Sequence, residues 1–316
     1  MPIQHRGILR LAYVHIALQD PDPAVSFYTE RLGLLATDAT ARHTMLRCWH
    51  EPYRFSYVVE RADADRLVEL AFEVRDGADL DALATAVAAA GAEVTRSDAD
   101  AVLPGVGASI SFVAPGGHRI RLTEGLEQPG YVSGPFAPDW NPPGSIRGCP
   151  APLNLLHAGI TVPDPAATVA FFTDVLGFGV ADRITSDADP GTLLSALLFR
   201  TTNGQDLAIF PGPAGGLHHV GFLVEDETDV LRSAAYLTEG GALPTDPFGT
   251  TVQLYGNTFS CHLKDPAGVR LEVFSGGRYT ELHPEFAAVT WTESALPQAL
   301  AFIDTAENKD FLAPCL

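Results

Sequence analysis

The sequence predicts an α+β protein in which four βαβββ modules form two domains, each with a sheet that curls around a cavity and helices outside it. The first observation behind this prediction is an internal repeat. Residues 13–34 (YVHIALQDPDPAVSFYTERLGL) read in the same order as residues 156–178 (LHAGITVPDPAATVAFFTDVLGF). Both segments run from an alternating strand through Asp-Pro and a helical stretch to Leu-Gly, as expected for a duplicated structural unit.

The second observation is that each half holds another copy of the unit. A strand, an acidic turn, a helix and a glycine stop follow one another in residues 67–94 and again in 217–243. Hairpins around Pro-x-Gly follow at 111–125 and 261–277. Apolar residues three and four apart in VAFFTDVLGF give that helix one face for the sheet.

The third observation is a break between the halves. Residues 131–152 are rich in proline and glycine, which is typical of a linker. We therefore expect a structural N-terminal domain over 1–130 and a catalytic, metal-binding C-terminal domain with a tail over 153–316.

Composition excludes several classes of function. The net charge of −19 and the pI near 4.7 disfavour binding to nucleic acid or to an anionic membrane surface. The sequence contains no uninterrupted apolar run of about 20 residues, so it predicts no membrane span. The first residues do not resemble a secretory signal, and we therefore expect a cytoplasmic protein. The cysteines lack CxxC spacing, which argues against a zinc cluster or a disulfide framework; they are Cys48, Cys149, Cys261 and Cys315.

Strand alternation predicts which side chains face the cavity of the second half. In residues 156–162 the apolar row of Leu156, Ala158, Ile160 and Val162 belongs against the helix, so His157 faces inward. In residues 217–224 the same rule places His219 inside and His218 on the outer row or at the mouth of the strand. In residues 269–274 it places Glu272 inside, on the row that also holds Arg270 and Phe274.

Two histidines and one carboxylate from three strands form the facial triad that suits Fe(II), or Mn(II), and leaves positions open for other ligands. A single histidine would more often be a hydrogen-bonded core residue, but an inward glutamate needs a partner. The other histidines, His43, His50, His118 and His283, read as isolated surface or turn residues.

The first half provides an internal comparison. Its positions that correspond to the triad hold Tyr13, Glu69 and Arg121, which do not form a chelate. Because an Arg–Glu pair satisfies itself, we expect a structural N-terminal cavity without metal.

Four segments carry a resemblance to a known family: LLHAGITVPD, GLHHVGFLVED, KDPAGVRLEVFSGGRY and AAVTWTESALPQALAF. The chain resembles the type I extradiol ring-cleavage dioxygenases of the vicinal oxygen chelate superfamily, similar to catechol 2,3-dioxygenase, nearly end to end. The resemblance implies two vicinal-oxygen-chelate domains and Fe(II) held by His157, His219 and Glu272. It also implies that O₂ and a catechol-like substrate give a ring-opened semialdehyde, in a homo-oligomer, a dimer or tetramer.

The chain departs from this family where proton transfer takes place. Gln205 and Gln253 stand where the family has histidines, and His262 stands where it has a tyrosine. Glutamine orients a substrate but cannot exchange protons at neutral pH, whereas imidazole can. His262 is therefore either a relocated acid–base group or a structural histidine, and Tyr255 is a weaker candidate. Tyr279 resembles a family tyrosine near the site, and an interfacial packing role fits it equally well.

These departures leave other functions open. One alternative is an iron dioxygenase for an aminophenol or another ring that needs less base. A second is a metal-dependent isomerase or lyase that uses no O₂. A third is a small-molecule binding or resistance protein, against which an intact triad argues.

Overall fold

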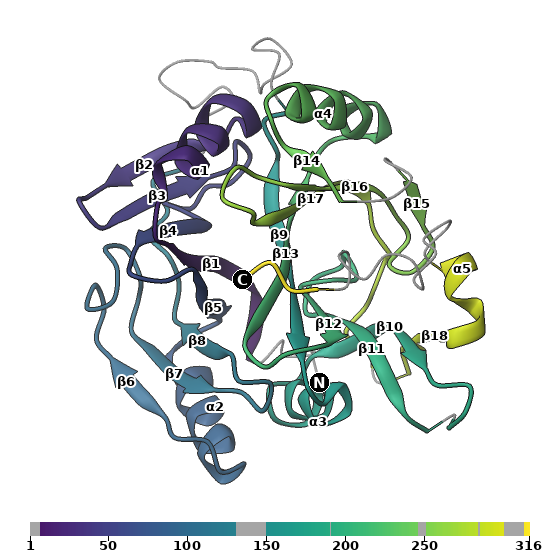
Figure 1. The fold of residues 1–316 in the computed structure, drawn as a ribbon. Coiled ribbons are helices and arrows are strands. Elements are labelled where there is room, and N and C mark those ends of the chain that lie inside the picture. The colour runs from purple at the N-terminus through teal and green to yellow at the C-terminus, as the bar shows by residue number, and fades with distance from the viewer. Residues whose placement is uncertain (1–6, 131–149, 190, 246–250, 284, 300–312) are drawn as a thin grey trace.

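Four βαβββ modules follow one another along the chain in the computed structural model, which describes residues 7–130, 150–189, 191–245, 251–283, 285–299 and 313–316 (Figure 1). The first half contains β1 (Ile8–Leu18), α1 (Asp22–Ser26) continued by η1 (Phe27–Leu32), β2 (Leu35–Ala39), β3 (His43–Arg47) and β4 (Tyr57–Arg61). It goes on with β5 (Arg66–Val74), α2 (Gly77–Ala89), β6 (Thr95–Ser97), β7 (Ser109–Val113) and β8 (Arg119–Thr123).

The second half repeats this order and adds a tail. Its elements are β9 (Asn154–Val162), α3 (Pro165–Ala170) continued by η3 (Phe171–Val175), β10 (Gly179–Thr185), β11 (Leu193–Phe199) and β12 (Leu207–Pro211). Then come β13 (Gly216–Leu223), α4 (Glu227–Glu239), β14 (Leu243–Pro244), β15 (Thr251–Gln253), β16 (Thr258–Lys264) and β17 (Arg270–Gly276). The tail contains β18 (Val289–Thr292), η4 (Glu293–Ala295) and α5 (Leu296–Ala299).

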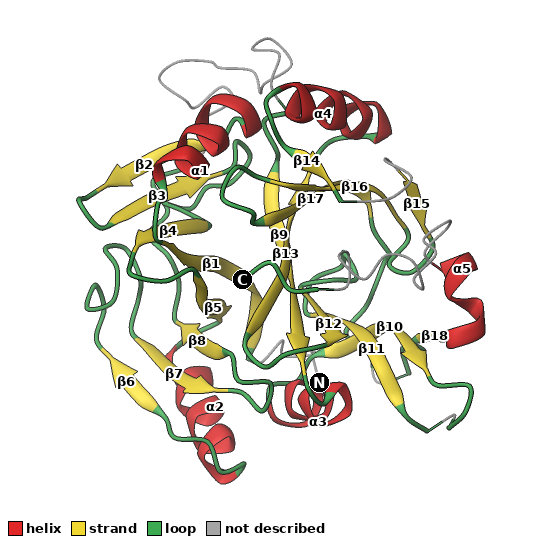
Figure 2. Ribbon diagram, viewed as in Figure 1, coloured by secondary structure: helices red, strands yellow, loops and turns green. Residues whose placement is uncertain are grey.

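Each half builds one sheet with the same order of strands. The first sheet runs β2-β3-β4-β1-β5-β8-β7-β6, and the second runs β14-β16-β17-β13-β9-β12-β11-β10-β18, with β15 paired to β16. The first strands of the two modules therefore lie side by side at the centre of each sheet. Helices lie outside both sheets (Figure 2). The predicted α+β class and the four modules are confirmed.

Acidic residues start the helices at the turns that the sequence repeats. The side chains of Asp76, Asp164 and Asp226 each accept a hydrogen bond from the backbone amide three residues later. Pro165 follows Asp164 at the first turn of α3, where the missing N–H costs nothing.

One hydrophobic core joins the helix-facing sides of the two sheets. Aromatic rings meet across the halves, with Tyr57 against Phe222 at 6.0 Å and Phe72 against Phe178 at 5.3 Å between centroids. The opposite rows of both sheets stay free of this core and line two separate hollows. The predicted metal ligands of the second half, His157, His219 and Glu272, lie on its inward row.

Two irregularities in the pairing of β9 with β13 change the predicted rows. The register shifts between Leu217 and His219, and again where Gly221 and Phe222 meet β9. The second shift places Leu155 in the core and leaves Leu156 half-buried, so the prediction for Leu156 was wrong. A β-bulge puts two residues opposite one and moves the alternation by one position.

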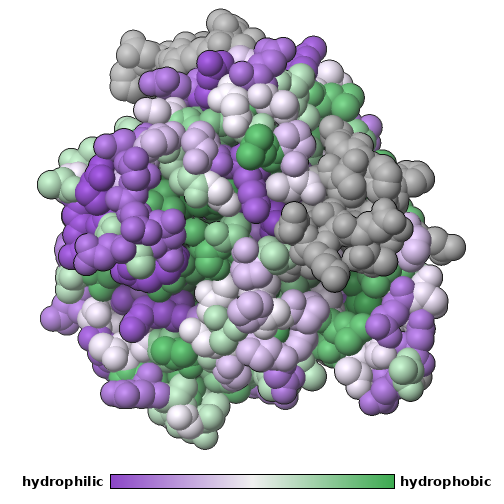
Figure 3. Space-filling view, viewed as in Figure 1, coloured by the Kyte–Doolittle hydropathy of each residue, from purple (hydrophilic) through white to green (hydrophobic). Residues whose placement is uncertain are grey.

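Figure 3 shows hydrophilic residues gathered over β2 and β3, beside a recess in which apolar side chains lie.

Within the described part of the chain, every helix is too short or too polar to span a bilayer. Cys48, Cys261 and Cys315 are free thiols, while Cys149 and most of the predicted linker, 131–149, lie outside the described residues.

Candidate metal centre and active site

Three side chains from three strands of the second sheet meet in its hollow. His157 comes from β9, His219 from β13 and Glu272 from β17, and all three are at most 3% exposed. The Nε2 atom of His157 lies 3.0 Å from Nε2 of His219 and 2.7 Å from Oε2 of Glu272. The Nε2 atom of His219 lies 3.4 Å from the same oxygen. One nitrogen or oxygen from each residue thus points at a shared centre.

Two glycines make room for the imidazoles. A Cβ atom on Gly221 would stand 2.1 Å from the ring of His157, and one on Gly159 would stand 2.5 Å from the ring of His219. No real Cβ tolerates such distances, so each ring occupies the space that a neighbouring glycine leaves empty. Both glycines lie on the predicted inner row.

Burial sets the charge states of the cluster. It lowers the pKa of His219 to about 3, so this imidazole is neutral at pH 7 and its lone pair is free to bind a cation. Burial opposes ionisation of Glu272, but the neighbouring His262 and His157 outweigh it and hold the pKa of Glu272 well below its usual range. A neutral imidazole at His219 and an ionised carboxylate at Glu272 are protonation states that suit metal binding.

His218 does not lie on the outer row, which was one of the two positions predicted for it beside the mouth of the strand. The bulge in β13 turns it toward the same cavity, where its ring stacks on Phe210 with 4.5 Å between centroids. Its Nδ1 atom lies 2.7 Å from Nδ1 of His219. If Nε2 of His219 binds a metal, its Nδ1 carries the proton and donates to Nδ1 of His218, which fixes the ring that the metal contacts.

A cavity of about 400 Å³ opens beside the cluster. Its wall is mainly apolar, and its polar members include His219 and Glu272 of the cluster. The apolar and aromatic part is formed by Ile184, Leu194, Leu197, Ala208, Phe210, Pro211 and Leu296. This size and polarity fit a small aromatic molecule held with one polar edge toward the cluster.

The four predicted acid–base and orienting residues all line this cavity. The Nε2 atom of His262 lies 3.8 Å from Oε2 of Glu272, and its ring centroid lies 5.3 Å from that of His219. The side-chain NH₂ group of Gln205 is buried without a hydrogen-bond partner among the described residues. Gln253 donates to Ser260, and Tyr255 exchanges a 2.9 Å hydrogen bond with Ser195. Burial raises the pKa of the Tyr255 hydroxyl, so it stays protonated.

The corresponding positions of the first half form a closed network instead. The hydroxyl of Tyr13 donates to Glu69 at 2.6 Å, and Nε of Arg121 donates to the same oxygen at 2.8 Å. Arg121 also donates to Ser109. The predicted Arg–Glu pair is present, and both Tyr13 and Arg121 donate to Oε1 of Glu69.

Several residues were placed wrongly, or missed, by inspection of the sequence. His43 lies half-buried in β3, and His118 is buried with its Nε2 3.1 Å from the carbonyl of Gly216, so neither is an isolated surface residue. His50 and His283 are exposed, as predicted. Tyr279 is 69% exposed and lies outside the cavity wall. The repeat gave no signal for Phe210 or Ser195, because their roles depend on which strands close the cavity.

Family models match the chain in both halves. Residues 154–273 match the Glyoxalase/Bleomycin resistance protein/Dioxygenase superfamily, and residues 69–123 match the catechol 2,3-dioxygenase-like N-terminal domain. The metapyrocatechase of Pseudomonas sp. (strain CF600) is 29% identical over 97% of this chain and 98% of its own length. The 3-methylcatechol 2,3-dioxygenase of Pseudomonas putida (strain F1 / ATCC 700007) is 30% identical over 88% of this chain and 93% of its own.

The chain belongs to the extradiol dioxygenases. The crystal structure of the 2,3-dioxygenase LapB from Pseudomonas sp. KL28 superposes with a TM-score of 0.83 at 26% identity, covering 92% of this chain and 99% of LapB. The manganese-dependent 2,3-dihydroxybiphenyl 1,2-dioxygenase of Geobacillus genomosp. 3 is 25% identical over 90% of this chain and 91% of its own. The extradiol dioxygenases similar to this chain thus include one named for manganese.

Proposed function

We propose that this extradiol dioxygenase opens a catechol-like aromatic ring with O₂ at a metal held by His157, His219 and Glu272. The observation that carries the proposal is the convergence of these three side chains beside an apolar cavity. The curated relatives act on catechols and biphenyldiols by their names, which supports the same class of substrate here.

The donor set fits Fe(II), with Mn(II) as the alternative. Two imidazoles and one carboxylate suit either ion, and three protein ligands leave coordination positions open. Such a metal, when bound, brings the catecholate and O₂ together and passes electron density between them. The protein's own part is to hold the ring in place, exclude water and move protons.

We assign proton transfer to His262. It lines the cavity beside the carboxylate ligand, and the strand alternation that turns it inward also turns Ser260 inward. Neither Gln205 nor Gln253 can accept a proton at neutral pH, and the hydroxyl of Tyr255 is held protonated. Imidazole can both accept a proton from a ring hydroxyl and return one to the product.

The other polar residues of the wall orient the substrate and each other. Gln205 offers a buried NH₂ group that has no partner among the described residues and that a ring oxygen of the substrate would satisfy. Gln253 donates a hydrogen bond to Ser260, and Tyr255 shares one with Ser195. We therefore propose that these two residues hold the cavity wall in place. The described wall contains no lysine or arginine, which favours an uncharged ring substituent over a carboxylate.

Oxygen uptake by iron-loaded protein with a panel of catechols tests the proposal. We expect uptake that matches substrate loss, together with a coloured ring-opened product, and faster turnover with neutral than with carboxylated catechols. Metal-dependent conversion without oxygen uptake would show isomerase or lyase chemistry. Tight binding without conversion would show a binding protein. Reloading the metal-free protein with Fe(II) or Mn(II) in parallel decides which ion supports turnover.

The variant His262→Gln tests the assignment of the acid–base group. We expect kcat to fall about 10²-fold, the typical contribution of a positioned proton-transfer group, with bound metal unchanged. The exposed His283→Ala serves as the matched control. A variant that keeps its kcat and pH profile would show that His262 is structural.

We also propose a homo-oligomer, a dimer or tetramer, on the resemblance to the family. Exposed apolar side chains such as Leu243, Val252 and Leu254 leave surface that a second copy would cover. Light scattering on the eluted protein measures the mass, and a mass of one chain at micromolar concentration would refute this proposal.

A further inference from the structure

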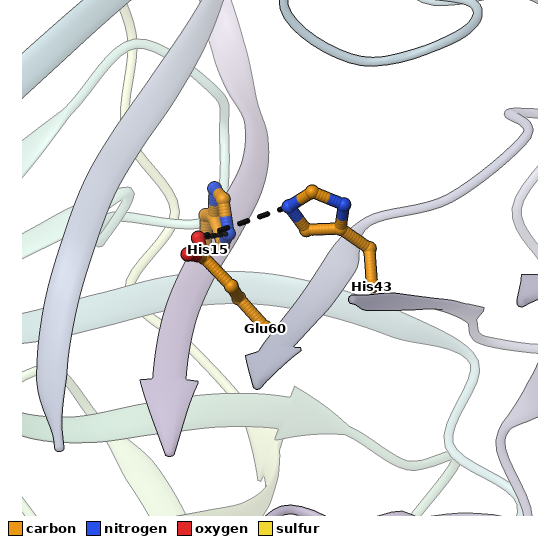
Figure 4. A group of neighbouring side chains, drawn as sticks. All are labelled: His15, His43 and Glu60. Carbon is orange, nitrogen blue, oxygen red and sulfur yellow. Dashed lines mark ion pairs between the residues drawn. The ribbon is translucent and has the colours of Figure 1, made fainter. Parts of the chain in front are cut away.

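A second cluster of two histidines and one glutamate lies in the hollow of the first half. His15 comes from β1, His43 from β3 and Glu60 from β4 (Figure 4). The Oε2 atom of Glu60 lies 3.0 Å from Nε2 of His15 and 3.8 Å from Nε2 of His43. All three ligand atoms lie within 4.8 Å of one another. Two atoms bound to one ion in tetrahedral coordination lie about 3–3.6 Å apart, so this spacing is close to that of a metal site.

His15 is buried, and among the described residues it has fewer partners than a buried imidazole needs. The residue is 5% exposed, and neither of its ring nitrogens makes a hydrogen bond within the described part of the chain. The Nε2 atom of His15 lies at ion-pair distance from Glu60, and its Nδ1 atom has no hydrogen-bond partner among the described residues. An unsatisfied polar group in the interior costs free energy, so the position calls for a ligand.

The two carboxylate oxygens of Glu60 have different neighbours. Its Oε1 atom accepts from Arg42 at 2.7 Å, and Arg66 lies 3.8 Å from the same oxygen. Its Oε2 atom is left facing the two imidazoles. Arg42 therefore holds the carboxylate ionised and orients it, as the outer partners of metal ligands commonly do.

The rings themselves are in the form that binds a cation. Burial lowers the pKa of His15 to about 4 and also lowers that of His43. Both are thus neutral at pH 7. The side chain of His43 is 23% exposed, which gives an ion a path from solvent.

This cluster is not a relic of the triad in the second half. His15 corresponds to Gly159 of the second half. His15 pairs with Glu69 between β1 and β5, and Gly159 pairs with His219 between β9 and β13. By the same registers, Glu60 corresponds to Phe210 and His43 to Ser195, which line the cavity of the second half. The cluster therefore lies in the first half at the positions that form the cavity wall in the other.

We propose that His15, His43 and Glu60 bind a divalent transition-metal ion of the Zn(II) class, independently of the dioxygenase centre. Two imidazole nitrogens and one carboxylate oxygen are common zinc ligands, and the side toward His43 leaves a position for water. Such an ion ties β1, β3 and β4 together. The Tyr13–Glu69–Arg121 network stays intact, because it shares no ligand atom with the cluster.

Zinc binding to the chain with the substitution His219→Ala tests this proposal, because that change disables the other centre. Equilibrium dialysis with metal analysis should find about one equivalent of Zn(II) in His219→Ala and none in His219→Ala/His43→Ala. His219→Ala/His283→Ala, which removes an exposed imidazole instead, should keep its equivalent. Substitution with Co(II) should give the visible absorption of a low-coordinate site in the first and third proteins alone.

Three outcomes would overturn the proposal. The first is that His219→Ala binds no zinc. The second is that His219→Ala/His43→Ala keeps its equivalent of zinc. The third is that His219→Ala/His283→Ala loses its equivalent of zinc as His219→Ala/His43→Ala does. Far-ultraviolet circular dichroism confirms that each variant is folded. His43→Ala alone should keep oxygen-consuming turnover with iron, so failure of this inference and failure of the proposed dioxygenase activity give different results.

Discussion

The two hollows show how one architecture gives two different interiors. Tyr13 pairs with Ala71 across β1 and β5, and His157 pairs with Gly221 across β9 and β13. In the second half the glycine leaves space for an imidazole, so His157 can turn to the ligand centre. In the first half alanine fills that space, and the tyrosine hydroxyl closes a network with Glu69.

The comparison teaches that the convergence of His157, His219 and Glu272 needs space as well as the right side chains. Gly159 faces His219 in the second half, whereas His15 faces Glu69 in the first. A side chain at the position of Gly159 would occupy the ring of His219. The difference between the halves thus includes both the ligand residues and the residues opposite them.

The largest expected effect is loss of the centre in the second half. We expect His219→Ala to lose bound iron and to lower oxygen-consuming turnover by about 10³-fold or more, because one of three ligands is removed. His218→Ala should lower metal affinity by only about 10–100-fold, since its ring orients His219 from outside. Metal content and initial rates, with His283→Ala as control, measure both. Equal effects at the two positions would mean that both rings bind the metal.

The closed network of the first half should affect stability instead of turnover. Arg121→Met leaves Glu69 buried without its cation, which should lower the free energy of unfolding by about 3 kcal/mol. Arg119→Met changes an exposed arginine on the same strand and should have little effect. Urea unfolding measures the difference. If both variants unfold at the same urea concentration, the network does not hold the first half together.

Exchanging the residue that pairs with His157 tests the role of the space that its ring occupies. Gly221→Ala gives the second half the residue of the first, and the new methyl group would stand 2.1 Å from the ring of His157. We expect weaker iron binding and a loss of about 2 kcal/mol of stability from overpacking. Gly191→Ala, at an exposed position with ordinary contacts, is the control. Unchanged iron affinity would show that the ring moves aside freely.

The smallest expected effect lies where the halves meet. Tyr28 of the first half donates to Asp265 of the second, and burial raises the pKa of that carboxyl to about 6. Because the folded state holds the proton more tightly than the unfolded chain, Asp265 contributes stability below its unfolded pKa near 3.9 and loses it as pH rises through 6.

The pH dependence of unfolding tests that contact. Relative to Asp265→Asn, the wild-type protein should gain about 1 kcal/mol of stability between pH 7 and pH 5. Asp98→Asn, on the surface, should follow the wild type. A difference between wild type and Asp265→Asn that does not change with pH would mean that this carboxyl titrates normally.

Much of this protein follows from its sequence alone. Repeated strand, helix and hairpin patterns determined the four modules, because alternation and helical periodicity are local properties of the chain. The same alternation turned His157, His219, Glu272 and His262 inward, and the structure places all four in one hollow. The resemblance to extradiol dioxygenases depended on short local motifs that contain His157, His219 and Glu272.

Only the tertiary structure decided the rest. The bulge that brings His218 into the cavity depends on how β13 pairs with β9, which no pattern within either strand reveals. His15, His43 and Glu60 are far apart in sequence, and they meet because β3 and β4 fold back onto β1. Local patterns predict which way a side chain faces on a regular strand, whereas the order and register of the strands decide where a bulge reverses that direction and what the side chain meets there.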